Sequence, residues 1–225
     1  MIRLAALLFW AAPAAAGIVS ADYTEPTTRY AHGILGDAIE WGALVMRDDS
    51  GRRLTVRLPE NRVFEDTAPR LADVDGDGDG EVIVVETDVT QGARLSIYDE
   101  TGLVAANAFI GRTNRWLAPA GIADLDGDGR VEIAYVDRPH LAKRLRIWRL
   151  EGDTLREIAA LDGVTNHRIG DSTIAGGVRD CGVGPELVLL SADWSRVVAV
   201  ALPGPSLRDL GPNSGNRLNA ALGCR

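Results

Sequence analysis

The sequence lacks the features by which several large classes of protein are recognised. It contains no GxSxG, HExxH, P-loop or dinucleotide-binding motif. After the first sixteen residues it has no apolar run long enough to cross a bilayer, and no long stretch with helical periodicity. We therefore expect no membrane span and little helix, and we expect a binding protein rather than an enzyme.

Basic residues are outnumbered by acidic ones, 24 to 32. The formal net charge is −8, and removing residues 1–16, whose one charged residue is Arg3, changes it to −9. Because binding to phosphates relies on clustered cations, we expect neither nucleic acid nor an anionic membrane surface as a partner. The 225 residues are 46% hydrophobic, which is enough apolar material for one domain with a substantial core.

The first sixteen residues, MIRLAALLFWAAPAAA, have the pattern of a secretory signal peptide. Arg3 precedes an apolar run that ends with small residues at Ala14 and Ala16. This pattern predicts cleavage before Gly17, with a second possible site after Ala21. A membrane anchor is the alternative, but the run is well short of the roughly 20 residues that a spanning helix needs. We therefore expect the protein to be secreted or periplasmic.

Cysteine is limited to Cys181 and Cys224. In an oxidising compartment a pair of cysteines is more often bridged than free, so we expect a disulfide, with two free thiols as the alternative. The bridge would close a loop of about 44 residues, which is worth roughly 4 kcal/mol at most in the chain-entropy model. It would tie the last residues of the chain to an interior loop.

The chain repeats itself with a period near fifty residues. Three stretches align on Glu81, Glu132 and Glu186, in steps of 51 and 54 residues, and a shortened copy precedes them from His32. Each copy is followed by runs with strand-like alternation, such as RLSIYD and RLRIWRL, and turn residues separate these runs. Several short strands in each repeat and no helix predict a β-propeller.

We therefore predict an all-β fold, a small β-propeller of about four four-stranded antiparallel blades. A β-sandwich with coincidental acidic turns is the alternative. Because the C-terminal segment resembles the start of a blade, we expect it to add a strand to the first blade and close the ring. The predicted divisions are a signal peptide at 1–16 and a propeller domain at 17–225, with blades at 27–63, 64–112, 113–164 and 165–212 and a closing segment at 213–225.

Two copies of the repeat carry a dense acidic loop, DVDGDGDGE from Asp73 and DLDGDGRVE from Asp124. Carboxylates stand at loop positions 1, 3, 5 and 9, and glycines at 4 and 6 permit the positive φ angles that wrapping around a point requires. Four carboxylates forced together repel one another, so a hard divalent cation is expected among them. The eight carboxylates are those of Asp73, Asp75, Asp77, Glu81, Asp124, Asp126, Asp128 and Glu132.

Calcium suits these loops best, because it takes about six to eight oxygen ligands in irregular geometry. Magnesium, which prefers a stricter octahedron, ranks second, and zinc prefers cysteine or histidine. Position 7, Asp79 or Arg130, would supply a backbone carbonyl. The loops are not EF-hands, because position 12 is Val84 or Tyr135 rather than glutamate. We expect two structural calcium sites, since a catalytic metal keeps an open position beside acid–base groups.

The stretches DVDGDGDGEVIVV and DLDGDGRVEIAYV resemble the calcium loops of FG-GAP repeats, also described as VCBS-like repeats, in β-propellers of the integrin α-subunit type. The resemblance implies that the loop joins the first two strands of a blade. It also implies that side chains at positions 1, 3, 5 and 9 and the carbonyl at position 7 bind calcium. Family members usually form seven-bladed rings, whereas this chain has material for about four. It therefore closes a small ring, or it needs a partner or further copies of itself.

The fourth unit departs from the calcium-loop pattern. It keeps Asp180 and Glu186 but has Val178 and Cys181 within the loop, so we expect no metal there. A disulfide to Cys224 would take the place of the ion in holding this unit together.

The segments that lead into the blades of a propeller gather around its axis, so they form the candidate ligand surface. Arginines with aromatic side chains suit an anionic or carbohydrate ligand. The alternative is that these residues plug the channel and pair with Asp37, Asp171 or Glu65. We expect His140 to be an exposed turn residue. The candidate ligand-binding residues are Arg29, His32, Arg115, Trp116, His167, Arg168 and Arg217.

Three functions remain open on the sequence alone. The main hypothesis is an exported, bacterial-type propeller, stabilised by calcium, that acts as a binding or interaction module for a protein, carbohydrate or anionic ligand. The second is a small polysaccharide-active enzyme, a lyase or hydrolase, with Arg115 and His167 at the axis, although no catalytic residue is assigned. The third is a structural subunit that completes a partner's ring.

Overall fold

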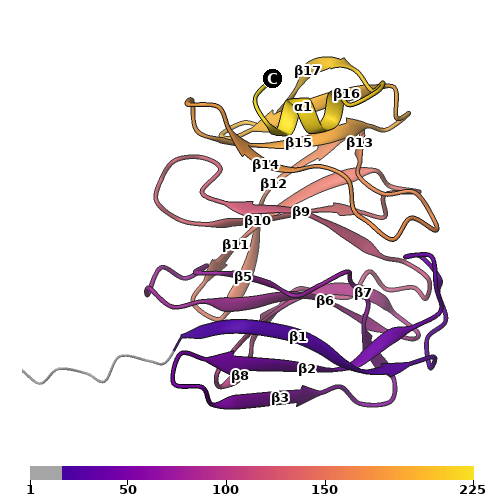
Figure 1. Ribbon diagram of the computed structural model, residues 1–225, viewed down its shortest axis with the longest axis vertical. Helices are drawn as coiled ribbons and strands as arrows, with labels where there is room; N and C mark the ends of the chain where they lie inside the picture. The colour runs from indigo at the N-terminus through magenta and orange to yellow at the C-terminus, as the bar shows by residue number, and fades with distance from the viewer. Residues whose placement is uncertain (1–16) are drawn as a thin grey trace, which may run out of the picture.

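The computed structural model describes residues 17–225, which form seventeen strands and one short helix. The predicted signal peptide, residues 1–16, lies outside the described residues. Figure 1 shows the strands in layers stacked along the long axis, with the N-terminal layers at the bottom and the C-terminal ones at the top. Every pair of neighbouring strands is antiparallel, so the predicted all-β, antiparallel class is confirmed.

The first two units lie in the lower half of the molecule (Figure 1). The first unit has β2 between its two partners, and the second has β6 and β7 at its centre. The strands of the first unit are β1 (Ile18–Thr27), β2 (Glu40–Asp48) and β3 (Arg53–Arg57). Those of the second are β4 (Arg62–Phe64), β5 (Arg70–Ala72), β6 (Glu81–Asp88), β7 (Gly92–Asp99) and β8 (Gly102–Ala106).

The third and fourth units form the upper half. The third is a meander of four strands, and the fourth is a five-stranded sheet followed by the helix. The third unit contains β9 (Leu117–Ala123), β10 (Glu132–Asp137), β11 (Arg144–Glu151) and β12 (Thr154–Asp162). The fourth contains β13 (Val164–Thr165), β14 (Gly177–Asp180), β15 (Pro185–Ser191), β16 (Arg196–Ala201) and β17 (Ser206–Pro212), with α1 (Arg217–Leu222) after it.

Strand pairing in the described residues gives three sheets, whereas four separate blades were predicted. A single bridge, Trp41 with Phe64, joins the first two units into one eight-stranded sheet, while the third and fourth units remain separate sheets. Within residues 17–225 no sheet closes on itself. The first unit also begins earlier than the predicted boundary at residue 27, because β1 pairs with β2 from Ile18 onward.

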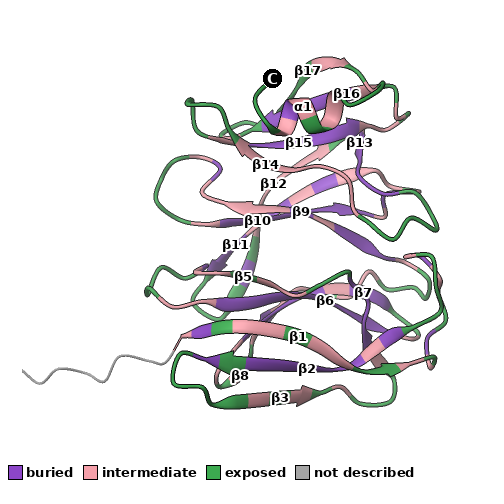
Figure 2. Ribbon diagram, viewed as in Figure 1, coloured by how far each residue is buried: buried purple, intermediate pink, exposed green. Residues whose placement is uncertain are grey.

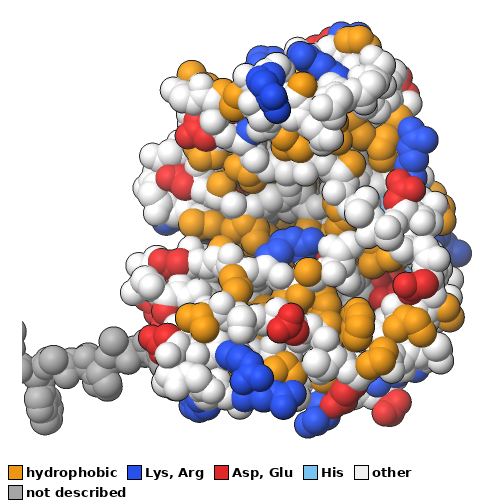
Figure 3. Space-filling model, viewed as in Figure 1, with side chains coloured by type: hydrophobic (Ala, Val, Ile, Leu, Met, Phe, Trp, Pro, Cys, Tyr) orange, Lys and Arg blue, Asp and Glu red, His pale blue; other side chains and the backbone are white. Residues whose placement is uncertain are grey.

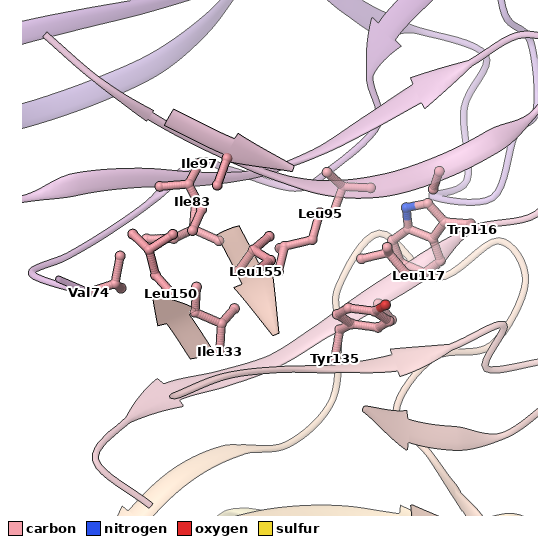
Figure 4. Close-up of a cluster of buried hydrophobic side chains, with 14 of the residues drawn as sticks. Val74, Ile83, Leu95, Ile97, Trp116, Leu117, Ile133, Tyr135, Leu150 and Leu155 are labelled. Carbon is pink, nitrogen blue, oxygen red and sulfur yellow. The ribbon is translucent and has the colours of Figure 1, made fainter. Parts of the chain in front are cut away.

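The central strands are buried on both faces because layers cover them above and below. All eight residues of β6 and all six of β10 are buried, so these β-branched runs lack the alternation of a half-exposed strand. Figure 2 shows the buried residues along these inner strands and the exposed ones at turns and outer edges. Ile83 and Leu95 from the second unit meet Ile133 and Leu155 from the third (Figure 4), which fixes the stacking of the two halves.

The C-terminal segment forms a helix, so the predicted strand that would close the ring is wrong. Leu218, Ala221 and Leu222 follow a helical spacing, and they pack against Val188 and Leu190 on the outer face of β15. The apolar side of α1 therefore covers the sheet of its own unit, and the segment does not reach the sheet of the first unit. In the described part of the chain no helix has the length and apolarity to span a membrane.

The predicted disulfide is confirmed. Cys181 and Cys224 are bonded, with their Cα atoms 5.6 Å apart. The bridge joins the loop between β14 and β15 to the residue that follows α1 and Gly223. It therefore ties the helix to the sheet that the helix covers.

Two opposite edges of the stack carry the features of functional interest. The loops between β5 and β6, β9 and β10, and β14 and β15 lie one above another on the left in Figure 1. Figure 3 shows acidic side chains along this edge and a hollow between the lower and upper halves. On the other edge, loop 28–39 of the first unit meets loop 166–176 of the fourth, where the Gly170 N–H donates to the Ile34 carbonyl at 3.0 Å.

Candidate functional site

The loop between β5 and β6, called here the 73–81 loop, wraps around the side chain of Asp73. Its two carboxylate oxygens accept hydrogen bonds from the N–H groups of Gly76 at 2.7 Å and Gly78 at 3.1 Å. Both glycines have positive φ angles, +83° and +98°, which side chains with a Cβ rarely adopt. The Val74 N–H donates to Glu81 Oε2 at 2.7 Å, so the loop begins and ends against the same centre.

Carboxylates converge inside this loop without a counter-charge. Oxygens of Asp73, Asp75 and Glu81 lie within 4.8 Å of one another, and so do those of Asp77, Asp79 and Glu81. Glu81 is only 3% exposed. Burial, reinforced by Asp75, Asp77 and Asp79, raises the pKa of Glu81 to about 7. Within residues 17–225 none of these five carboxylates takes part in an ion pair with an arginine or lysine, so the loop holds an excess of negative charge.

The loop between β9 and β10, called here the 124–132 loop, has the same backbone design. Asp124 accepts from the N–H groups of Gly127 at 2.7 Å and Gly129 at 2.9 Å, and the Leu125 N–H donates to Glu132 at 2.7 Å. Oxygens of Asp124, Asp126 and Glu132 again lie within 4.8 Å of one another. Three of the four carboxylate positions predicted to face a common centre, positions 1, 3 and 9, therefore lie together in both loops, and their binding of a metal stays a prediction.

A cation from the protein itself lies in the 124–132 loop. Arg149 stands opposite Glu132 in the register of β10 and β11. Its guanidinium donates to Glu132, with Nε 2.8 Å from Oε1, and lies 3.1 Å from carboxylate oxygens of both Asp126 and Asp128. The Arg149 side chain is only 6% exposed. Sequence proximity missed this cation, because seventeen residues separate it from Glu132.

The residues predicted at positions 5 and 7 are placed differently in the two loops. Asp77 and the carboxylate of Asp79, which was expected to offer only its carbonyl, form a second acidic group around Glu81. Asp128 instead pairs with Arg130, whose Nη2 is 2.7 Å from it. This hydrogen bond, with help from Arg149, holds the pKa of Asp128 below its usual value.

The corresponding loop of the fourth unit is organised around arginines. Asp180 accepts from the N–H groups of Gly182 and Gly184, so a small backbone turn remains. Glu186 pairs with Arg179 at 2.7 Å and with Arg208. Although burial opposes it, this pairing lowers the pKa of Glu186.

A pocket of about 400 Å³ lies on the opposite edge, where loops of the first, third and fourth units converge. It is called here the inter-unit pocket. Three of the predicted ligand residues line it, namely His32, Arg115 and Trp116. The expectation that His140 is an exposed turn residue is wrong, because His140 is half-buried in the wall. The remaining lining residues are Ile34, Asn114, Arg138, Leu141 and Ile169.

The other predicted ligand residues lie outside the pocket lining. His167 is buried behind the wall, 3.2 Å from His140 between Nδ1 and Nε2. Arg29 donates to the Arg62 carbonyl, and Arg168 lies over the ring of Trp194. Arg217, finally, donates to the Leu210 carbonyl.

A buried carboxylate fixes the orientation of His32. Its Nδ1 is 2.5 Å from Glu65 Oε1, and the Thr87 hydroxyl donates to Glu65 Oε2 at 2.6 Å. The indole N–H of Trp116 donates to the Glu65 carbonyl at 2.8 Å. Pairing with Glu65, one of the predicted alternatives, is thus seen for His32. It leaves His32 Nε2 as the ring nitrogen without a partner in the described structure.

Comparison with known protein families matches part of the chain. Residues 73–135 match the FG-GAP-like repeat, a span that contains both the 73–81 and 124–132 loops, all of β6 and the start of β10. The chain therefore contains an FG-GAP-like repeat, and the resemblance drawn from its acidic loops is confirmed. A search of the curated proteins finds no match.

Proposed function

We propose that the protein is an exported binding module of the propeller type, built from four repeat units and stabilised by calcium. The observation that supports the proposal most directly is the 73–81 loop, where carboxylates converge on a buried glutamate within an FG-GAP-like repeat and meet no counter-charge. Oxygen ligands of this kind suit calcium, which tolerates irregular geometry. The ion would hold β5 and β6 together and neutralise the loop, which is a structural role.

The two loops are not equivalent as calcium sites. In the 73–81 loop the carboxylates of Asp73, Asp75 and Glu81 would hold the ion, joined by Asp77 and the carbonyl of Asp79. In the 124–132 loop an ion would compete with the Arg149 guanidinium for Asp126 and Glu132. We therefore assign the stronger site to the 73–81 loop and a weaker one to the 124–132 loop, with the carbonyl of Arg130 in the corresponding place.

Export is supported by the start of the first strand and by the disulfide. Strand β1 begins at Ile18, which is 4% exposed, so cleavage before Gly17 leaves the strand whole. Cleavage after Ala21 would remove this buried residue. A bonded Cys181–Cys224 pair is typical of the periplasm or the extracellular space.

The inter-unit pocket is the ligand surface that this proposal favours. It lies where loops of the first and fourth units are hydrogen-bonded, so a ligand there would contact both ends of the stack. The His32–Glu65 pair also resembles an oriented acid–base group, which keeps a polysaccharide-active enzyme as the second candidate. Release of new reducing ends, or of unsaturated products, from polysaccharides during incubation with the protein would favour that candidate.

Calcium removal tests the main proposal. We expect a chelator to lower the melting temperature of the mature protein by about 5–10 °C, and added calcium to restore it. The basis is that a ligand at a hundred times its Kd contributes about 2.7 kcal/mol, and each kcal/mol shifts a domain of this size by about 2–4 °C. Isothermal titration with the chelated protein should find one strong site. An unchanged melting temperature after chelation would contradict the proposal.

A further inference from the structure

We propose that the inter-unit pocket binds a small carboxylate that also carries hydroxyl groups, with Arg115 holding the carboxylate and His32 holding a hydroxyl. The inference names the ligand class of the proposed binding module, and it rests on that function. It is carried by an arginine without an acidic partner, an oriented histidine and an apolar rim, all of which line one pocket of about 400 Å³.

Arg115 supplies the only charge of the pocket lining that is not balanced by the protein. The sole hydrogen bond of its side chain in the described structure runs from Nη1 to the backbone carbonyl of Asn114, at 2.7 Å, and it has no ion pair there. Arg138, the other arginine of the lining, is held by both oxygens of Asp137 at 2.8 and 2.9 Å. A guanidinium has five N–H donors, so most of those of Arg115 are left for a planar, two-oxygen ligand such as a carboxylate.

His32 supplies a hydrogen-bonding position in the same pocket. Glu65, which is fully buried, holds Nδ1, and Tyr30 packs edge-on against the imidazole ring. The ring therefore has a fixed orientation, with Nε2 on the side away from Glu65. A nitrogen in that position can exchange a hydrogen bond with a hydroxyl, and a ligand without hydroxyl groups would leave it unsatisfied.

The remaining walls select against a large or highly charged ligand. Burial lowers the pKa of His140 to about 4, so the His140–His167 pair adds no positive charge at neutral pH. A single unpaired guanidinium, that of Arg115, favours a monoanion over a phosphate dianion. Leu141 and Ile169 are 62% and 71% exposed at the rim, where they offer apolar contact to the carbon skeleton of a ligand. The volume is in the range of known small-molecule pockets.

The test uses thermal shift and isothermal titration of the mature, calcium-loaded protein with probes that differ in one feature. Gluconate, galacturonate and lactate carry both groups, galactose lacks the carboxylate, cyclohexanecarboxylate lacks the hydroxyls, and inorganic phosphate is a different anion. We expect at least one of the first three to bind at least ten times more tightly than every control. Binding of none of the three, or phosphate binding as tightly as the best of them, would overturn the proposal.

Two matched variants locate the binding. We expect Arg115→Gln to weaken binding of the best probe at least tenfold, whereas Arg112→Gln, an exposed arginine three residues away, leaves it unchanged. His32→Gln should weaken binding of that probe while cyclohexanecarboxylate is unaffected. If His32→Gln does not fold, the comparison of Arg115→Gln with Arg112→Gln still tests the site. Equal binding of the probe by these two variants would refute it.

The melting temperature of the same samples, measured with and without a chelator, distinguishes failure of this proposal from failure of the function on which it rests. If the melting temperature falls on chelation but no hydroxylated carboxylate binds, the ligand class is wrong and the calcium-stabilised module stands. If such a ligand binds and chelation has no effect, the pocket stands and the calcium role is wrong.

Discussion

The 73–81 and 124–132 loops have nearly the same sequence and similar backbone hydrogen bonds. They differ in whether a cationic side chain of the protein offsets the negative charge of their clustered carboxylates. In the 124–132 loop the strand partner of Glu132 is Arg149, whose guanidinium reaches three carboxylates. In the 73–81 loop, β6 and β7 pair Val82 with Tyr98, and the next residue along β7 is Asp99, another acid. The residue across the ladder therefore decides whether the protein itself supplies a counter-charge to a repeated acidic motif.

The fourth unit extends this comparison. It keeps the glutamate of the motif, Glu186, but surrounds it with Arg179 and Arg208 and carries the disulfide beside it. The three units thus range from a loop with no internal cation, through a loop with one, to a loop with two arginines and a covalent bond. Dependence on calcium should decrease in the same order.

The largest effect is expected from removing the internal cation. Arg149→Gln should destabilise the chelated protein by about 3 kcal/mol, because Glu132 and its neighbours lose a buried partner. The value is at the low end of the range for buried pairs, since Asp126 and Asp128 are partly exposed. Calcium should restore most of the loss, and titration should now find two strong sites instead of one. Urea unfolding with and without calcium measures the change.

A matched control for this variant is Arg156→Gln. Arg156 is an arginine of the same unit, 68% exposed, that pairs with Glu151 on the surface. Surface pairs contribute about 0–1 kcal/mol, so little change is expected. If Arg149→Gln behaved like this control, the guanidinium would not be the counter-charge of the loop.

The second-largest effect is a difference in calcium-induced stabilisation between matched substitutions in the two loops. Asp75→Asn should abolish most of the calcium-induced stabilisation, about 2–3 kcal/mol, while Asp126→Asn keeps it. The reason is that the first removes a ligand from the loop without an internal cation, and the second removes one from the loop that already has Arg149. Asp180→Asn in the fourth unit should leave the calcium response intact. Thermal unfolding at several calcium concentrations measures all three, and equal losses from Asp75→Asn and Asp126→Asn would contradict the comparison.

The smallest of the three effects is expected from the disulfide. Replacing both Cys181 and Cys224 by serine should cost about 2 kcal/mol, equally with and without calcium. The cost is at the low end because Arg179 still donates to the Ala221 carbonyl and α1 still packs on β15. A loss of stability that appeared only in the chelated protein would show that the disulfide and the bound calcium are energetically coupled. We do not expect this, because the disulfide lies in the fourth unit and the 73–81 loop lies in the second. Denaturant titration of the double variant measures it.

Local patterns predicted the parts of the fold that depend on neighbouring residues. Alternation in RLSIYD and RLRIWRL agrees with β7 and β11, and glycines at loop positions 4 and 6 adopt the positive φ angles expected of them. Strand β1 was not anticipated, because residues 18–27 include two acidic residues and a proline. Its pairing with β2 decides its structure rather than its own composition.

Features that join distant segments could not be read from the sequence. Arg149 becomes a counter-charge only through the register of β10 and β11, and His32 meets Glu65 across 33 residues. The basic residues Arg29, Arg168 and Arg217 resembled Arg115 in sequence, yet only Arg115 lines the pocket. Which of several similar arginines is free to bind a ligand depends on the carbonyl groups and the aromatic ring that folding brings to the others.

Helix α1 limits how the molecule can grow. Its apolar side lies on the face of β15 on which another four-stranded layer would stack, and the Cys181–Cys224 bond holds it there. A longer relative that gained a layer at this end of the stack by duplication of the repeat would therefore first have to lose the helix. In that respect α1 acts like the terminal cap of a solenoid, whose polar exterior stops further propagation.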